Sequence, residues 1–126
     1  MTAVLDRIAA LSGHNYLQGR HIASQGERAP IIDPATEAVI GHYALSSPEE
    51  VDTAIRHANA AQPGWWALSA LERAEVLHEV ARKLKQQAPA VAEALTREMG
   101  KPYRESLWEC GDGAASSLAY YAELAR

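Results

Sequence analysis

The sequence has few of the residues that mark secreted, nucleic-acid-binding or membrane proteins. Its 126 residues include one cysteine, Cys110, so no disulfide can form within the chain, which is typical of a reducing compartment. Twelve lysines and arginines against sixteen aspartates and glutamates give a formal charge of −4 with no basic stripe, so we expect no nucleic-acid partner. Apolar runs are only a few residues long and Asp6 interrupts the N-terminal one, so we expect neither a membrane span nor a signal peptide. We therefore expect a cytoplasmic protein.

The length allows one domain at most. A chain of this size buries roughly two-thirds of its extended-chain surface on folding, but it is short for a cofactor enzyme with two lobes. Residues 1–47 hold turn formers and short β-type stretches, and residues 48–126 are nearly continuous helix in pattern. We predict an α+β chain, in which a small antiparallel N-terminal sheet precedes three to four helices.

Short elements are expected before residue 48. Residues 3–11 favour a leading helix, and Gly19 suits a tight turn between strands that contain Tyr16 and Ile22. Pro30 suits the start or the edge of a strand at 31–32, because it has no N–H to donate. The chemistry of residues 33–36 (DPAT) predicts a turn, after which residues 38–43 resume an extended pattern.

The helical signals after residue 46 are stronger. Ser47 with Glu50, and Ser69 with Glu72, have the spacing of capping boxes, and each precedes an amphipathic apolar stripe. We expect Pro63-Gly64 to end the first helix and Pro89 to restart the second. Gly100 is a natural C-cap, and a last helix is expected from about Pro102 to the end.

The residues with reactive or metal-binding side chains form no catalytic or cofactor-binding constellation. The histidines lack zinc-site spacing, and Cys110 lies in a helical stretch without a histidine one turn away, so a structural thiol is favoured over a nucleophile. Gly111-x-Gly113-x-x-Ser116 resembles a dinucleotide fingerprint, but no strand precedes it, which favours helix packing. We predict no catalytic and no cofactor-binding residue in this chain.

Three further features have an ordinary and a functional interpretation. One ring of Trp65-Trp66 is expected to fill a corner between helices, the alternative being a ligand platform. The run Arg82-Lys83-Leu84-Lys85 is expected to be a solvated helix face rather than a binding patch. Glu98, before Gly100, fits either a cap or a cation ligand, and its spacing alone does not decide between them.

Six short motifs in a fixed order nevertheless carry a resemblance over almost the whole chain. They are Tyr16-Leu17-Gln18-Gly19; residues 31–41 (IIDPATEAVIG); residues 47–52 (SPEEVD) with the following Trp65 or Trp66; Glu72-Arg73 with Leu77; residues 98–102 (EMGKP); and residues 119–122 (AYYA). In this order the chain resembles the N-terminal segment of the NAD(P)-dependent aldehyde dehydrogenase superfamily. Asp33 stands where the family usually has Asn, and Glu37-Ala38 stand for its usual Gly-Glu.

The resemblance implies that residues 1–126 are the N-terminal portion of the α/β cofactor-binding domain of an enzyme that oxidises aldehydes to carboxylic acids. The family's cysteine nucleophile, oxyanion-holding Asn, Glu base and Rossmann segment match nothing in this sequence, and Cys110 does not inherit the nucleophile's role. NAD or NADP is therefore implied for the full-length enzyme, and no cofactor is expected to bind this chain alone.

The resemblance also implies partners and one metal site. Expected partners are the remainder of the enzyme chain and, for the full-length form, further copies in a homo-oligomer. Some family members bind a monovalent cation before the turn that corresponds to residues 33–36. By position the ligands in this chain would be Ile31, Ile32 and Glu98, with a further contributor from the rest of the enzyme. An alternative from another class is a stand-alone helical interaction or oligomerisation module, because an amphipathic layer without its sheet would expose its apolar stripe.

Overall fold

The computed structural model describes residues 3–124, which fall into two compact units. The first unit consists of Met1–Gln62 with Arg97–Met99, and the second of Pro63–Thr96 with Gly100–Arg126. Two long helices pass from one unit to the other, so the chain changes unit within a helix rather than at a linker.

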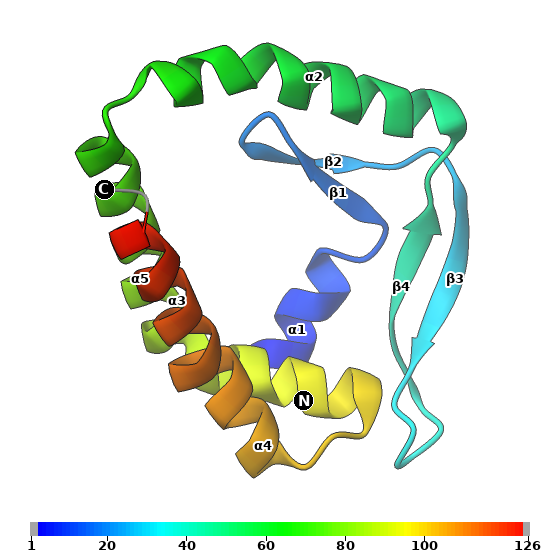
Figure 1. Cartoon of the computed structure of the whole chain (residues 1–126). Helices are drawn as coiled ribbons and strands as arrows, with labels where there is room; N and C mark the ends of the chain where they lie inside the picture. The colour runs from blue at the N-terminus through cyan, green and yellow to red at the C-terminus, as the bar shows by residue number, and fades with distance from the viewer. Residues whose placement is uncertain (1–2, 125–126) are drawn as a thin grey trace. The chain divides into compact units, whose positions relative to one another are not determined.

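The first unit begins with a short helix and a tight hairpin, as the sequence predicts (Figure 1). Helix α1 (Ala3–Ala10) is followed by strands β1 (His14–Leu17) and β2 (Arg20–Ala23), which pair antiparallel. Gln18 and Gly19 connect the strands with φ of 54° and 76°. Two consecutive positive φ values give the turn whose twist matches that of the strands, and Gly19 adopts its value without strain.

A second antiparallel hairpin follows, so the predicted small sheet is present as two two-stranded sheets. Strand β3 (Glu27–Ile32) pairs with β4 (Val39–Leu45), and the register shifts between Ile31 and Ile32. The strand begins before Pro30 rather than at it, which corrects the predicted boundary. In a two-stranded sheet every second N–H points away from the partner strand, so an internal proline is accommodated.

Helix α2 (Pro48–Ala67) begins at the predicted capping box but continues past the predicted end. The Ser47 N–H donates to Glu50 Oε2 at 2.9 Å, and the Glu50 N–H donates to Ser47 Oγ at 3.2 Å. The prediction that Pro63-Gly64 ends the helix is wrong. Pro63 removes its own N–H from the ladder and its ring crowds the carbonyl one turn earlier, yet the helix continues through it for four more residues. The helix ends where the Leu68 N–H bonds to the Trp65 carbonyl, just before the next cap.

Helix α3 (Ala70–Met99) has the predicted capping box at Ser69 and Glu72 and the predicted left-handed Gly100 C-cap, with φ of 72°. The predicted restart at Pro89 is wrong, since one helix of 30 residues runs through it. Pro89 lies on the exposed side, whereas Ala74, Ala81, Ala88 and Ala92 on the other side are buried. Packing of this alanine face therefore overrides the local preference of proline.

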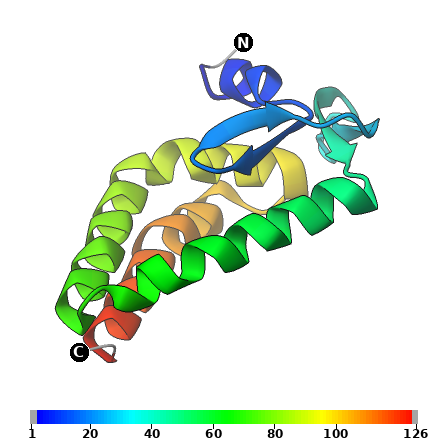
Figure 2. The same ribbon diagram turned by 90° about the horizontal axis from the view of Figure 1, so that it is seen from above.

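The last helical stretch is interrupted, which corrects the prediction of a single helix from Pro102. It consists of α4 (Tyr103–Trp108), a π-helical segment η1 (Glu109–Gly113) and α5 (Ala114–Leu124). Figures 1 and 2 both show α5 beside α3, and the ion pairs His78–Glu123 and Lys85–Asp112 join the two stretches, each at 2.9 Å. A Cβ on Gly111 would lie 3.2 Å from that of Ala88, so the near-fingerprint is a helix-packing feature, as predicted.

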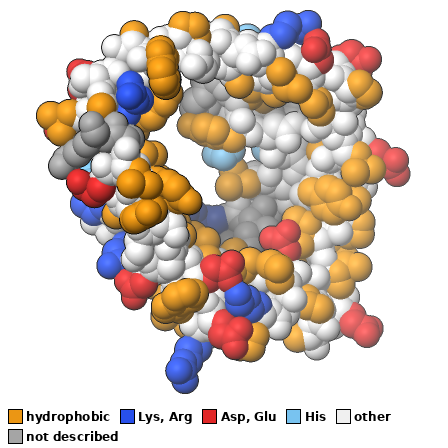
Figure 3. Space-filling view, in the orientation of Figure 1, with side chains coloured by type: hydrophobic (Ala, Val, Ile, Leu, Met, Phe, Trp, Pro, Cys, Tyr) orange, Lys and Arg blue, Asp and Glu red, His pale blue; other side chains and the backbone are white. Residues whose placement is uncertain are grey.

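The apolar core is made of small side chains. Among the described residues, the buried apolar side chains are all alanines: Ala74, Ala81, Ala88, Ala92, Ala115 and Ala122. Large apolar side chains remain exposed on every long helix, and hydrophobic side chains are visible at many places on the surface in Figure 3. The apolar faces of these helices therefore lack a covering layer.

Candidate functional site

The turn between β3 and β4 holds the most enclosed charged group of the described structure. The Asp33 side chain is 3% exposed, and its Oδ1 accepts the Ala35 N–H at 2.8 Å, the bond that makes residues 33–36 a turn. Its Oδ2 accepts from Nη1 of Arg97, in the last turn of α3, at 3.1 Å. The amide of Ala35 and the guanidinium of Arg97 hold the pKa of Asp33 below its ordinary value. The turn is thus fastened to the end of α3 by an ion pair.

The residues expected to hold a cation lie on these same two segments. Ile31, half-buried, and Ile32, exposed, end β3 at its register shift, directly before Asp33. Glu98 is exposed and follows Arg97, and it belongs to the same compact unit as both isoleucines. The side chain that bridges the segments is Arg97 rather than Glu98.

The donor chemistry of this set fits a monovalent cation. Two backbone carbonyl oxygens and one carboxylate are hard oxygen ligands, and a ladder irregularity is where a carbonyl can turn away from its partner strand. Within residues 3–124, no hydrogen bond or ion pair engages the Glu98 carboxylate. Clusters of three or more His, Cys, Asp or Glu side chains able to hold a metal are absent from the described residues.

Glu50 is a second polar centre, with more partners than the capping box that its spacing from Ser47 predicts. Its carboxylate also accepts Ser24 Oγ at 2.8 Å and the Gln25 N–H at 3.0 Å. The amides of Ser47 and Gln25 and the Ser24 hydroxyl lower the pKa of Glu50. One side chain therefore ties the loop between β2 and β3 to the start of α2. A loop serine such as Ser24 is too common in sequences to reveal such a contact in advance.

A groove of about 660 Å³ lies between the β1–β2 hairpin and the first half of α2. Its apolar lining includes Tyr16, Leu17, Ile22, Val51 and Ile55, and a 2.7 Å hydrogen bond joins Gln18 Nε2 to His57 Nδ1 among its polar residues. Two of its polar lining residues are engaged in structural bonds, His57 with Gln18 and Glu50 with the loop before β3 and the start of α2. Its character is that of a packing surface.

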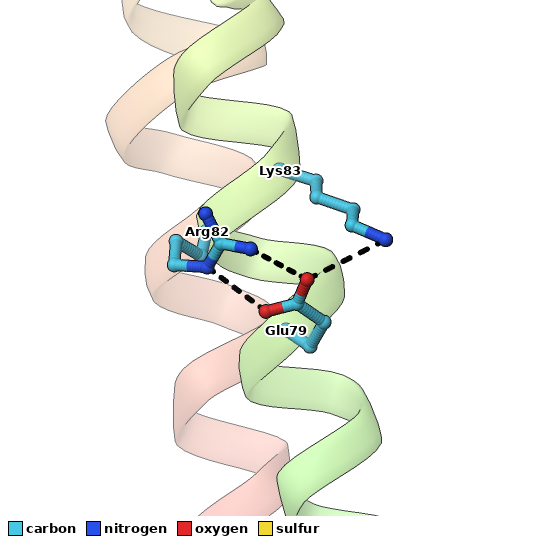
Figure 4. Close-up of polar contacts among 3 residues, drawn as sticks. All are labelled: Glu79, Arg82 and Lys83. Carbon is cyan, nitrogen blue, oxygen red and sulfur yellow. Dashed lines mark hydrogen bonds and ion pairs between the residues drawn. The ribbon is translucent and has the colours of Figure 1, made fainter.

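The charged run and the lone thiol lie as predicted. Glu79 binds Arg82 at 2.6 Å and Lys83 at 3.4 Å on the exposed side of α3 (Figure 4), and Lys85 pairs with Asp112. Contact with the Arg82 guanidinium lowers the pKa of Glu79. These contacts identify the run as a solvated helix face. Cys110 is half-buried within η1, which agrees with a structural thiol.

Neither ring of the tryptophan pair is fully buried in the described structure. Trp65 is 39% exposed and Trp66 is 70% exposed, with the Arg73 guanidinium 5.3 Å from the centre of the Trp66 ring. Trp66 is therefore largely open to solvent and stacks with Arg73, whereas most of Trp65 is covered, so at most one ring contributes to packing and neither is buried.

Comparisons with known proteins agree with the order of the motifs. The Aldehyde dehydrogenase family matches residues 21–126. A 3-succinoylsemialdehyde-pyridine dehydrogenase of Pseudomonas is 39% identical over 88 residues, which are 69% of this chain and 18% of that protein. The chain therefore spans about a fifth of the length of such relatives.

Solved structures of aldehyde dehydrogenases match the fold of this chain over most of its length. The crystal structure of lactaldehyde dehydrogenase from Escherichia coli is 31% identical, with a TM-score of 0.85 over 91% of this chain and 24% of that one. Betaine aldehyde dehydrogenase from Staphylococcus aureus in complex with NAD+ is 27% identical, with a TM-score of 0.84 over 96% of this chain and 24% of that one. The predicted fold class, part of a larger α/β domain, is thereby confirmed.

Proposed function

Because the chain belongs to the aldehyde dehydrogenase family, we propose that it is the N-terminal portion of an oxidoreductase that converts an aldehyde to a carboxylic acid with NAD or NADP. The observation that carries this proposal is the match of residues 21–126 to about a fifth of the length of the enzymes it resembles. The NAD+ complex of one structural neighbour supports the choice of cofactor class.

The groups that perform the oxidation belong, in this proposal, to the other four-fifths of such an enzyme. Thiohemiacetal formation needs a thiolate nucleophile with an adjacent oxyanion hole, and hydride transfer needs a bound nicotinamide. Cys110 is half-buried within η1. We assign residues 1–126 a supporting role as outer strands and helices of the cofactor-binding domain.

The exposed apolar side chains support the remainder of the enzyme as the partner of this segment. Val76, Val80 and Val91 on α3, and Leu124 on α5, are each more than a third exposed. Exposed apolar area on this scale marks an interface. A homo-oligomer for the full-length enzyme and a cytoplasmic location remain part of the proposal. Within the described residues, no helix has the length and apolar character needed to cross a bilayer.

The proposal includes a monovalent cation held by the carbonyl oxygens of Ile31 and Ile32 and the carboxylate of Glu98. Its support is the shared unit of these residues and their oxygen donor set. Such a cation would fix the β3–β4 turn against the end of α3. This role is structural, since none of the three residues is a nucleophile, a general base or a hydride carrier.

The activity proposal is tested with the purified 126-residue chain. We expect no reduction of NAD+ or NADP+ in the presence of aliphatic or aromatic aldehydes, measured by the absorbance of the reduced cofactor, with a complete aldehyde dehydrogenase as the control. Turnover by the pure chain would refute the assignment of the chemistry to other segments.

The alternative of a stand-alone interaction module is decided by size-exclusion chromatography with light scattering and near-UV circular dichroism. A segment that lacks its covering layer is expected to self-associate through its exposed apolar side chains without a discrete size. A discrete oligomer with fixed aromatic packing would instead favour the module.

A further inference from the structure

In the second unit, two ion pairs join α3 to the stretch formed by η1 and α5. His78 Nε2 lies 2.9 Å from Glu123 Oε1, and Lys85 Nζ lies 2.9 Å from Asp112 Oδ1. His78 and Lys85 are seven residues apart, about two turns of helix, so they lie on one face of α3. The two pairs therefore fasten two different points of the same interhelical contact, one in η1 and one in the last turn of α5.

His78 lies at the edge of the alanine face of α3. Ala74 and Ala81 are four residues before it and three residues after it, spacings that share one side of a helix, and both are buried. On α5, Glu123 directly follows Ala122, which is fully buried. The His78 side chain is 38% exposed and the Glu123 side chain is 56% exposed. The pair thus lies at the rim of a packed contact, where solvent can protonate the imidazole.

The two pairs respond differently to pH. Lysine and aspartate side chains ordinarily keep their charges between about pH 5.5 and pH 8, whereas the charge of histidine changes within this range. A carboxylate binds a protonated imidazole more strongly than a neutral one, because the hydrogen bond is then charge-assisted. The contact of Glu123 with His78 therefore gains strength as the pH falls, and the contact of Asp112 with Lys85 does not.

The charged neighbours of His78 on its own helix form a constant background. Glu75 and Arg82, which have opposite charges, lie about one turn before and one turn after it. Glu79, the next residue, is bonded to Arg82 at 2.6 Å. Carboxylate and guanidinium groups ordinarily stay charged over this pH range, so their effect on the imidazole does not change with pH.

The elements packed beside α3 contribute one charged partner. On α5 the titratable side chains near His78 are Glu123, within bonding distance, and the exposed Tyr121. Residues 63–67, the part of α2 that belongs to this unit, carry no titratable side chain. Protonation of His78 therefore acts on the contact with Glu123.

We propose that the His78–Glu123 pair is a pH-sensitive latch that fastens the C-terminal end of α5 to α3, beside the pH-insensitive Lys85–Asp112 pair. At about pH 5.5 the protonated imidazole binds the carboxylate, and the end of α5 stays docked with Ala122 buried. At about pH 8 the neutral imidazole binds more weakly, and this end opens more often. The inference uses only contacts within the second unit, so it does not depend on the proposed enzymatic role.

The test is a double-mutant cycle on the full 126-residue chain, with His78→Gln, Glu123→Gln and the double variant. Urea unfolding is followed by circular dichroism at about pH 5.5 and about pH 8. Titration of groups elsewhere is common to all four proteins and cancels in the cycle. We expect the two side chains to be coupled by about two- to fivefold in the unfolding equilibrium constant at the lower pH, and to show almost no coupling at the higher pH.

Lys85→Gln and Asp112→Asn form the matched control cycle, for which we expect the same coupling at both pH values. A control coupling that changed as much as that of His78 with Glu123 would assign the pH effect to the whole α3–α5 contact and overturn the latch. Equal coupling of His78 and Glu123 at both pH values, or no coupling at either, overturns it as well.

Amide hydrogen exchange tests the latch without global unfolding, for variants that do not unfold cooperatively. After correction for intrinsic exchange rates, we expect the last turn of α5 to be protected about two- to fivefold more strongly at about pH 5.5 than at about pH 8 in the original chain. Glu123→Gln is expected to lose this difference, and amides in the middle of α3 serve as the internal reference. Equal protection of the end of α5 at both pH values in the original chain contradicts the inference.

Discussion

At the residue scale, Gly26 is the position with the least space for a side chain. A Cβ there would lie 1.8 Å from the carbonyl oxygen of Leu45, at the open end of the β3–β4 hairpin. Gly64, in α2, would place its Cβ within 4 Å of no atom. Lack of space therefore requires glycine at position 26, whereas position 64 has room for a larger side chain.

We predict that Gly26→Ala lowers the free energy of unfolding by about 2–3 kcal/mol, because the backbone of β4 must move away. Gly64→Ala is the matched control and is expected to raise it by about 0.5–1 kcal/mol, because alanine loses less chain entropy in a helix. Urea unfolding followed by circular dichroism measures both. Equal effects of the two substitutions would contradict the close approach at Gly26.

At the element scale, the helix starts are set by short local signals. The Ser69 hydroxyl accepts the Glu72 N–H at 3.2 Å, and Glu72 Oε2 accepts the Ser69 N–H at 2.8 Å. The Ser69 hydroxyl and the Ser69 N–H, which both donate to Glu72 Oε2, lower the pKa of Glu72. A start of this kind depends on four consecutive residues, so the sequence predicts it without knowledge of the fold.

We predict that Ser69→Ala lowers the free energy of unfolding by about 1 kcal/mol, through the loss of the side-chain cap on α3. Ser116→Ala is the control, since Ser116 is exposed inside α5, where alanine is the better helix former and the change is expected to be a few tenths of a kcal/mol in the stabilising direction. A denaturation midpoint that falls equally for both serines would argue against the capping role.

The ends of the helices are less predictable than their starts. Whether α3 continues through Pro89 depends on its buried alanine face, and Ala88, one residue earlier, packs against Gly111. That contact joins residues 23 positions apart, so no local pattern reports it. The continuation of α2 through Pro63 and the π-helical segment η1 were not predicted for the same physical reason. Tertiary packing rather than local propensity decides such cases.

The same limit applies to the candidate site. The resemblance places Ile31, Ile32 and Glu98 on the correct segments, and the turn chemistry predicts the bond from the Ala35 amide to Asp33. The contact from Arg97 to Asp33 spans 64 residues, and no local sequence pattern around either residue predicts it. Local chemistry therefore predicts the turn, whereas the ion pair that fastens it requires the fold.

At the scale of the whole molecule, the charged contacts give stability a definite pH dependence. Asp33, Glu50, Glu72 and Glu79 all have pKa values lowered in the folded chain by hydrogen bonds or by a neighbouring cation. A carboxyl whose folded pKa is depressed contributes stability that is fully present above its unfolded pKa, near 4, and is lost as the pH falls through the folded value.

We therefore predict that these four carboxyl groups leave the thermal midpoint unchanged between about pH 7 and pH 5. Below about pH 4 their protonation is expected to lower the midpoint. Glu50→Gln is expected to reduce the size of this fall, because Glu50 accepts three of these bonds, from Ser47, Ser24 and Gln25. Melting curves in buffers of equal ionic strength measure the effect. An unchanged acid profile in Glu50→Gln would exclude Glu50 as a contributor.

The π-helical segment η1 sets the rotational phase of everything that follows it. An α-helix turns by about 100° per residue, and a π-helical turn inserts one residue into that count. The faces of α4 and α5 are thus offset by one residue, and the buried positions Ser106, in α4, and Ala115 and Ala122, in α5, lie on the two sides of this offset. Deleting one residue between 109 and 113 would return the stretch to a single phase and rotate both alanines away from their buried positions. The number of residues in η1 therefore determines which side chains of α5 face the buried side.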